Sequence, residues 1–231
     1  MHGNIQRAFG LLVVASLALP VLGQDRQCGA TETAPTNDQR CVSLPYTAQY
    51  KIIRVATQPD GTIVSRESSE VRAADSAGRW MDATTQPEPR AQTTITRIVV
   101  ADFVARTRST WEVPGKLATV TAMGPKCSIV RARPSKPPAE LLGTQTIQGI
   151  EAKGRRVTWN LPAGKVRTSE TWFAAAPGLW TLLVRAVYDS PTSKATTELV
   201  SVERSEPDPK VFRPPEGYEI VKKGAPPCPA K

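Results

Sequence analysis

Hydrophobic and polar residues alternate along most of the chain from Leu44 onward. In the stretch Tyr46–Ile52 (YTAQYKI) every second residue is apolar and the residues between are polar. A period of two is typical of a β-strand that buries one face. No segment has a convincing long helical period. The pattern therefore predicts an all-β fold.

Further short runs of strand-forming residues follow, each ended by a turn signal rich in Pro, Gly or Asp. We expect strands at Thr62–Ala74, Arg79–Thr84, Thr93–Ala101, Arg106–Val113, Leu117–Met123, Val157–Leu161, Ser169–Ala174, Leu179–Tyr188, Thr196–Arg204 and Tyr218–Val221. The run Leu179–Tyr188 is apolar at nearly every position, which predicts the most deeply buried strand. The run Thr62–Ala74 is polar on both faces, so we expect at least part of it to stand clear of any core.

Proline and glycine mark the expected breaks between strands, for example at Pro87, at Pro89 and at Pro114-Gly115. Pro209 is expected to begin a short helical turn at Lys210–Phe212, because proline is favoured in the first turn of a helix. Short turns and regular strand spacing are typical of an antiparallel meander. We expect one curved sheet, a half-barrel or open barrel, with few or short helices.

The domain organisation follows from the same patterns. Residues 1–23 combine a basic residue, an apolar run and small residues before a cleavage point, which predicts a signal peptide. Residues 24–43 are predicted to form a polar N-terminal arm and residues 44–222 a single β domain. A proline-rich basic loop at 124–140 lies inside that domain, between two halves of the sheet. Residues 223–231 are expected to be a flexible tail.

Cysteine usage agrees with export to an oxidising compartment. The four cysteines are Cys28, Cys41, Cys127 and Cys228, and all lie after the predicted signal peptide. Four cysteines allow three pairings. We favour Cys28 with Cys41 and Cys127 with Cys228, since the second pair would tie the tail to the body. A metal site is the weaker interpretation, because the close C-x-x-C spacing of a zinc site is missing.

The formal net charge of the chain is +9, and the basic residues are scattered along the strands. Scattered charge favours an ordinary solvated surface. The more specific alternative is a mild attraction of the basic surface to anionic lipid head groups or cell-wall polymers. The sequence holds no nucleic-acid-binding motif. After the signal peptide no segment is long and apolar enough to span a membrane. We expect a periplasmic or extracellular protein.

The residue types needed for common catalysis are missing. The single histidine, His2, lies in the predicted signal peptide, which removes the usual general base and histidine-based zinc chemistry. The segment Gly149–Arg156 copies the glycine spacing of a phosphate loop, but an arginine stands where lysine is needed. Its glycines Gly149 and Gly154 are interpreted as serving backbone conformation. We therefore expect no enzyme, no cofactor and no metal site.

Acidic residues and tryptophans are the remaining candidates. Glu67 with Glu70, and Glu203 with Glu206 and Asp208, are better explained as a solvated face than as a catalytic pair, which would have to face each other across a cleft. Core packing is the default for the five tryptophans. Trp80 and Trp111 lie in more polar strands and are the candidates for lining a ligand site, because aromatic rings tolerate polar neighbours.

Three segments carry a resemblance to a known family. They are LGTQTIQGIEAKGRR (142–156), SETWF (169–173) and EPDPKVFRPPEGY (206–218). Together they resemble a family of exported bacterial proteins of unassigned function, which share an LG-x-x-x-I-x-G-[VI]-x-A-x-G segment and a closing PDP-x-x-F-x-x-P-x-GY segment. The turn D-x-x-G-R, Asp75 to Arg79, is also similar. The family brings no established reaction.

More remotely, the meander and its closing motif are similar to the LolA-like half-barrel of periplasmic lipoprotein carriers. That resemblance implies a sheet curved around an apolar groove that shields acyl chains. This chain lacks the clear helices that plug those half-barrels. The leading hypothesis is a non-enzymatic protein that binds an apolar or amphipathic, lipid-like ligand on the concave face of the sheet. The alternative is a structural or protein-interaction module of the cell envelope with no ligand cavity.

Overall fold

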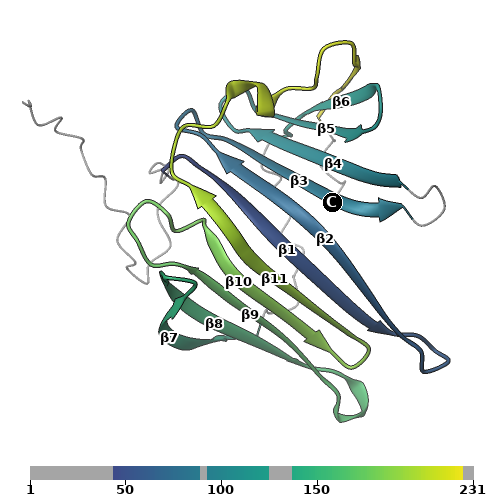
Figure 1. The fold of residues 1–231 in the computed structure, drawn as a ribbon, viewed down its shortest axis with the longest axis vertical. Helices are drawn as coiled ribbons and strands as arrows, with labels where there is room; N and C mark the ends of the chain where they lie inside the picture. Colours follow the sequence, from purple (N-terminus) through teal and green to yellow (C-terminus); the bar gives the residue numbers. More distant parts are fainter. Residues whose placement is uncertain (1–43, 89–92, 125–136, 226–231) are drawn as a thin grey trace, which may run out of the picture.

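The computed structural model describes residues 44–88, 93–124 and 137–225. Twelve strands form one sheet in the order β12-β6-β5-β4-β3-β2-β1-β11-β10-β9-β8-β7 (Figure 1). The two outermost strands do not pair with each other, so the sheet is open. The predicted curved all-β sheet with few short helices is confirmed.

The first six strands follow one another as neighbours in the sheet. They are β1 (Tyr46–Thr57), β2 (Ile63–Ala74), β3 (Arg79–Glu88), β4 (Thr93–Asp102), β5 (Thr107–Val113) and β6 (Leu117–Ala122). Each pairs antiparallel with the next one along the chain. The first half of the chain is therefore a simple meander, as the sequence predicted.

The second half forms another meander and ends with one exception. Its strands are β7 (Ala139–Ile147), β8 (Ile150–Asn160), β9 (Val166–Ala174), β10 (Leu183–Ser190), β11 (Ser193–Glu203) and β12 (Glu219–Lys223). Two single-turn helices, η1 (Pro162–Gly164) and η2 (Pro209–Phe212), interrupt them. The last strand, β12, pairs with β6 in parallel. Between β11 and β12 the chain passes from the middle of the sheet to the edge next to β6.

The two meanders are joined by the pairing of β1 with β11. Strand β7 follows β6 in the chain, yet β7 is the strand at one edge of the sheet and β6 lies next to the opposite edge strand, β12. Most of the predicted loop at 124–140 lies outside the described residues, and β7 begins at Ala139. Residues 1–43, which include the predicted signal peptide and arm, lie outside the described residues. The predicted tail begins at Lys223, which instead ends β12.

Two local predictions are wrong. The apolar run Leu179–Tyr188 is not one strand, because β10 starts only at Leu183. Leu179 and Leu182 are buried in a turn, closed by hydrogen bonds from Leu179 N to Ala176 O and from Leu182 N to Leu179 O. Pro87, expected as a break, lies inside β3 opposite Thr94 of β4. At that point β3 has run past its pairing with β2, so the missing amide hydrogen is not needed.

Two apolar clusters hold the sheet together. The first cluster packs residues of β1, β2, β8, β9, β10 and β11 with the turn before β10; its largest buried members include Tyr46, Tyr50, Leu179, Leu182 and Leu199. The second cluster comprises Ala73, Met81, Ile98, Val100, Trp111, Ala118 and Phe212. Phe212 belongs to η2, so this helical turn covers part of β3 in Figure 1. The predicted helical turn at Lys210–Phe212 is thereby confirmed.

The two glycines of the phosphate-loop-like segment have different physical roles. Gly149 has φ +77° and follows Gln148 in the hairpin turn between β7 and β8, a conformation that favours glycine. Gly154 has no such φ, but a Cβ there would lie 2.6 Å from ring atoms of Trp172 on β9. Backbone conformation thus explains Gly149, whereas close packing explains Gly154.

Replacing Gly154 with alanine should therefore destabilise the protein by about 2 kcal/mol, because the added methyl group overpacks the Trp172 ring. Gly149→Ala is the matched control: its Cβ meets nothing within 4 Å, so only the strained φ remains, at about 1 kcal/mol. Urea unfolding of both variants measures this. A G154A protein as stable as wild type would show that the ring moves away freely.

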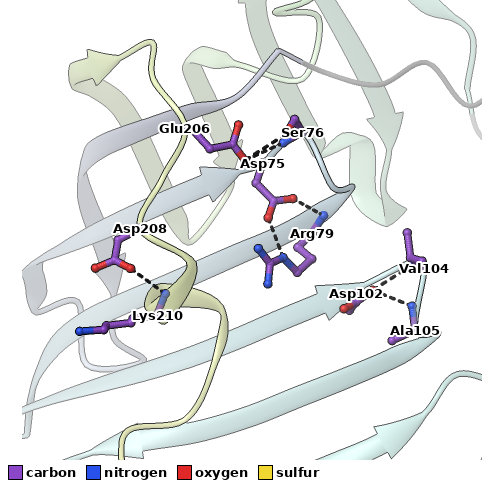
Figure 2. A network of polar contacts seen from close by, with 9 residues as sticks. All are labelled: Asp75, Ser76, Arg79, Asp102, Val104, Ala105, Glu206, Asp208 and Lys210. Carbon is purple, nitrogen blue, oxygen red and sulfur yellow. Dashed lines mark hydrogen bonds and ion pairs between the residues drawn. The ribbon is translucent and has the colours of Figure 1, made fainter.

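A buried ion pair fixes the turn between β2 and β3. The side chain of Asp75 is fully buried, and its two oxygens accept from Arg79 N at 2.7 Å and Arg79 Nε at 2.6 Å. The Arg79 guanidinium lies 4.7 Å from the centre of the Phe212 ring. Figure 2 shows that Glu206 accepts hydrogen bonds from the amide and the hydroxyl group of Ser76 at the same end of the sheet. The D-x-x-G-R turn therefore anchors the segment that leads into η2.

We expect Asp75→Asn to lower the free energy of unfolding by about 2 kcal/mol, since it leaves a largely buried arginine without its counter-ion. Asp102→Asn makes the same chemical change in an exposed turn, where Asp102 accepts only from the amides of Val104 and Ala105. That control should lose no more than about 1 kcal/mol. Thermal unfolding compares the two; equal losses would contradict the anchoring role of Asp75.

Candidate functional site

The register of the central strands places a set of aromatic and charged residues on one side of the sheet. Residues directly opposite one another in an antiparallel ladder project from the same face. Opposite pairs on this face are Tyr46–Ala74, Ala48–Arg72, Tyr50–Glu70, Ala74–Trp80, Arg72–Asp82, Asp82–Val99 and Tyr50–Leu199. We call this side of β1, β2, β3, β4, β10 and β11 the tyrosine face.

The tyrosine face is apolar around its two tyrosines. Tyr46 and Tyr50 are each 1% exposed, and Leu199 of β11 and Val184 of β10 belong to the same cluster. Burial raises the pKa of both tyrosines, although a hydrogen bond with Thr181 acts against this for Tyr46. Both hydroxyl groups therefore keep their protons at neutral pH.

Three charged residues interrupt this apolar surface. Glu70 is 7% exposed and accepts a hydrogen bond from Arg72 Nε on the same strand. The Arg72 guanidinium carbon lies 4.8 Å from the centre of the Tyr50 ring. Asp82 stands opposite Arg72 on β3. We call Tyr50, Glu70, Arg72 and Asp82 the central polar cluster.

The cluster holds one more negative charge than it can neutralise when both carboxyls are ionised. Burial raises the pKa of Asp82 to about 6; the charge of Glu70 and a hydrogen bond with it add to the rise, and Arg72 acts against it. A carboxyl that shares a partly buried site with a second carboxylate loses its proton only at a higher pH, because the two negative charges repel each other. Asp82 therefore changes charge close to neutral pH.

Two atoms of the central polar cluster are buried without a hydrogen-bond partner. They are the hydroxyl oxygen of Tyr50 and Oδ1 of Asp82. Within the described residues two other side-chain atoms share this state, Nε of Arg167 and Nε of Arg185, on β9 and β10. An unpaired buried polar group costs about 1–3 kcal/mol, so native structures usually supply a partner. Both atoms have almost no accessible surface, so a further polar group reaches them only if neighbouring side chains move.

A shallow groove lies on the other side of the same strands. Its volume is about 540 Å³, and its lining comprises Gln49, Tyr50, Lys51, Glu67, Ser68, Ser69, Glu70, Val71, Thr85, Gln86, Pro87, Thr94 and Val200. Lys51 and Glu67 form an exposed ion pair at 2.9 Å across it. Pairs of this kind contribute little binding energy. Its lining also includes the buried Glu70, so the groove borders the central polar cluster.

The structure separates the two tryptophans that the sequence put forward together. Trp80 lies on the tyrosine face, opposite Ala74, and is half-buried. Trp111 lies opposite Ile98, on the other side of the sheet, and is 5% exposed within the second apolar cluster. The two rings cannot line one surface. Trp80 alone lies next to the central polar cluster.

The acidic residues also differ from expectation. Glu67 and Glu70 project from opposite faces of β2, opposite Ile53 and Tyr50. The interpretation of Glu70 as part of a solvated face is wrong, since it is buried in its ion pair with Arg72. Sequence reasoning missed Asp82, yet a signal existed: counting outward from the turn at Asp75 places Arg72 opposite Asp82.

The remaining sequence candidates receive no test. Cys28, Cys41, Cys127 and Cys228 all lie outside the described residues, so their pairing stays a prediction. Within the described ranges no group of three or more Asp, Glu, Cys or His side chains could hold a metal ion. No helix in these ranges is long and apolar enough to cross a membrane.

Comparisons with known proteins give remote likenesses of fold. No family model matches the chain, and no curated protein sequence matches it. An uncharacterised conserved protein from Thermus thermophilus is 12% identical over 79% of this chain and 93% of its own, with a TM-score of 0.49. A LolA superfamily protein from Nitrosomonas europaea is 10% identical over 74% and 90%, with a TM-score of 0.35.

A third solved structure, the lipoprotein LppX from Mycobacterium tuberculosis, is 13% identical over 69% of this chain and 89% of its own, with a TM-score of 0.31. The remote LolA-like resemblance is thus met again among solved structures. At these TM-scores the likeness concerns the outline of the fold and gives no information on ligand or activity.

The raised pKa of Asp82 has a consequence for stability. Because the folded protein binds this proton more tightly than the unfolded chain, the contribution of Asp82 is favourable below pH 4 and is lost as the pH rises through 6. Asp82→Asn cannot ionise, so it should be about 1 kcal/mol more stable than wild type at pH 8, once solvent screening of this half-buried carboxyl is allowed for. At pH 4 the two proteins should be equally stable.

Urea unfolding at pH 4 and pH 8 measures this difference. Asp189→Asn is the control, because Asp189 is an exposed aspartate on β10. Its effect should be below about 0.5 kcal/mol and the same at both pH values. An Asp82→Asn protein that is less stable than wild type at pH 8 would contradict the assigned charge state.

Proposed function

We propose that the protein binds an amphipathic, lipid-like ligand on the tyrosine face and is not an enzyme. The observation that carries this proposal is the set of half-buried residues around the buried cluster on an open sheet: Trp80, Val99 and Ala186 keep part of their surface accessible. The Tyr50 hydroxyl oxygen and Asp82 Oδ1 are themselves fully buried, so the ligand covers the residues around them. An apolar tail covers these half-buried residues, and a polar head stays in water at their edge.

Half-buried residues around the buried centre offer surface to such a tail. Trp80 lies two residues from Asp82 on β3, and Val99 of β4 lies opposite Asp82. On the same face, beyond β1 and β11, Ala186 of β10 packs against the first cluster. Covering apolar surface contributes about 25 cal/mol for each Å² removed from water. Trp80 is therefore the sequence candidate that we keep as a ligand-lining residue.

Catalysis has little support from the same residues. Glu70 forms an ion pair with Arg72 and also a hydrogen bond with the Asp82 carboxyl, so each carboxyl is engaged inside the cluster. General acid–base chemistry needs a group within hydrogen-bond reach of the substrate. A binding role fits this arrangement better than a reaction.

An exported location suits this role. The predicted signal peptide and the net charge of +9 favour a protein of the periplasm or the extracellular space that meets anionic envelope lipids. We keep the lipid-like ligand as the leading partner and expect no nucleic acid.

One observation favours the alternative, a protein-interaction module of the envelope. Strand β7 is an edge of the sheet, and its Leu141 is 82% exposed. An exposed edge can pair with an extended segment of another protein. This alternative predicts tight association with a protein and no bound small molecule.

The decisive experiment is mass spectrometry of an organic extract of the mature protein, purified without detergent from an oxidising compartment. We expect a stoichiometric amphipathic molecule. Binding of a fluorescent apolar probe supports the same test: Trp80→Ala should weaken it about fivefold or more, because the ring supplies contact area. Phe103→Ala, in an exposed turn between β4 and β5, is the control and should bind as wild type does.

An empty protein that also fails to bind the probe would refute the ligand proposal and leave the edge-strand alternative. Loss of probe binding in both variants would show that the probe responds to general surface apolarity. A Trp80→Ala protein that binds normally would move the ligand away from β3.

A further inference from the structure

We propose that the polar head of the ligand is a phosphate, bound by the guanidinium groups of Arg54 and Arg66. This inference rests on the proposed function, because it names the head of the same lipid-like ligand. Both arginines lie on the tyrosine face, toward the end of the sheet where β1 turns into β2 and β10 into β11 (Figure 1). Both are exposed, so a head group reaches them from water.

The pairing of β1 with β2 places these two arginines directly opposite each other. Like charges in opposite positions of an antiparallel ladder destabilise the sheet. Nη1 of Arg54 donates to Ser68 Oγ at 3.0 Å, which does not neutralise its charge. Within the part of the chain that the structure describes, Arg66 has no hydrogen-bond or ion-pair partner for its side chain. An anion between the two guanidinium groups would turn this repulsion into attraction.

The neighbouring positions of this face supply no carboxylate. The row of directly opposite residues that contains the pair consists of Arg66, Arg54, Ala195, Tyr188, Ser169 and Val157. Among the described residues, this row and the row on each side of it hold no aspartate or glutamate from β2 to β8. The next acid along this face of β2 is Glu70, which is already paired with Arg72. These strands therefore leave the counter-charge to a ligand.

Two further arginines raise the positive potential on the same side of the sheet. The Arg167 guanidinium lies 4.6 Å from the centre of the Trp159 ring, and that of Arg155 lies 5.5 Å from the centre of the Phe173 ring. A ring face holds a guanidinium in place without removing its charge.

The opposite side of the sheet is arranged differently. There Lys51 is paired with Glu67, and Arg156 with Glu170. Unpaired basic charge is thus concentrated on the side that carries the tyrosine face, where it attracts anions.

The geometry of two separate guanidinium groups favours a phosphate over a carboxylate. A guanidinium binds an oxyanion through two parallel N–H···O bonds. A carboxylate offers two oxygens in one plane, which one guanidinium satisfies. A phosphate monoester has three terminal oxygens around a tetrahedral centre, so two guanidinium groups can bind it at once. Its charge of about −1.5 to −2 at pH 7 balances the two arginines.

The apolar tail begins beside the surface already assigned to it. Tyr188 shares the row of Arg54, with only the small side chain of Ala195 between them, and is 38% exposed. Ala186 belongs to the next row of the same face. A tail that starts at the arginines therefore covers the Tyr188 ring and Ala186 first. This burial adds to the affinity, so a phosphate with an alkyl chain should bind more tightly than phosphate alone.

The test measures the binding of dodecyl phosphate, dodecanol, dodecylammonium and inorganic phosphate to the mature protein, by calorimetry at pH 8 below micellar concentrations. We expect dodecyl phosphate to bind at least about tenfold more tightly than dodecanol, because charge-assisted hydrogen bonds are added. Dodecylammonium should bind most weakly of the three chain-matched probes. Inorganic phosphate should bind at least about tenfold more weakly than dodecyl phosphate, since it lacks the tail. Added salt should weaken the binding of dodecyl phosphate but not that of dodecanol.

Arg54→Gln combined with Arg66→Gln should abolish the preference for dodecyl phosphate and leave dodecanol binding unchanged. Arg54→Lys combined with Arg66→Lys keeps the charge but loses the planar fork, so it should keep only part of the preference. The matched control is Arg204→Gln combined with Arg213→Gln, which removes two positive charges from exposed residues between β11 and β12. It should bind every probe as wild type does. Urea unfolding verifies that each variant is folded.

The outcomes separate the head group from the function itself. If no dodecyl probe binds, the proposed lipid-like function fails together with this inference. If the three dodecyl probes bind equally, or dodecylammonium binds best, the phosphate head is refuted while the amphipathic-ligand function stands. Inorganic phosphate that binds as tightly as dodecyl phosphate would indicate a site for free phosphate and overturn the lipid head. A folded double glutamine variant that keeps the preference, or an equal loss in the control, would overturn the assignment to Arg54 and Arg66.

Discussion

The whole architecture depends on the backbone ladder that β1 forms with both of its neighbours. Strand β1 pairs with β2 from Tyr46 to Thr57, and on its other edge it pairs with β11, about 150 residues later in the chain. No other pairing of described strands joins the β1–β6 meander to the β7–β11 meander. The tyrosine face exists only through this ladder, because the charged residues of the central polar cluster come from β2 and β3 while Leu199 and Val184 come from the second half. A contact between such distant segments forms late and at a high cost in loop-closure entropy. The buried tyrosines of β1 are well placed to offset that cost.

Two register shifts adapt the second half to this face. One lies between Gln49 and Tyr50 in the pairing with β11, and the other between Leu183 and Arg185 in the pairing of β10 with β9. An extra residue in one strand increases the local twist and bends the sheet. Both irregularities lie beside residues of the first apolar cluster, which lets Trp172 of β9 join Tyr50 and Val184 in one core. Gly154 completes this arrangement, since only a residue without a side chain leaves room for the Trp172 ring.

Local patterns predicted the strands well, because alternation and turn chemistry act over a few residues. The Tyr46–Ile52 alternation, the helical turn before Phe212 and the meander itself could all be predicted this way. What failed depends on pairing between strands. The parallel return of β12 to β6 and the separate faces of Trp80 and Trp111 follow from register, which a single strand does not encode. Glu70 was misread for the same reason: within β2 it looks like one of several polar residues, and its burial comes from Tyr50 on the neighbouring strand.

The central polar cluster is the feature that folding physics explains least. A buried ion pair is rarely better for stability than apolar residues of the same size, so Glu70 and Arg72 need a reason of another kind. Register specification is a sufficient one: a slip of one residue in β2 would turn both Glu70 and Arg72 to the other face and remove the Arg72 guanidinium from the Tyr50 ring. That reason covers the two residues that satisfy each other. It does not cover Asp82, whose pKa rises to about 6 by burial and by the charge of Glu70, nor the Tyr50 hydroxyl, which is buried and unpaired. An apolar side chain at either position would fold at least as well. Packing and strand pairing therefore leave these two groups unexplained, and the ligand is placed at the half-buried residues around them, Trp80 among them.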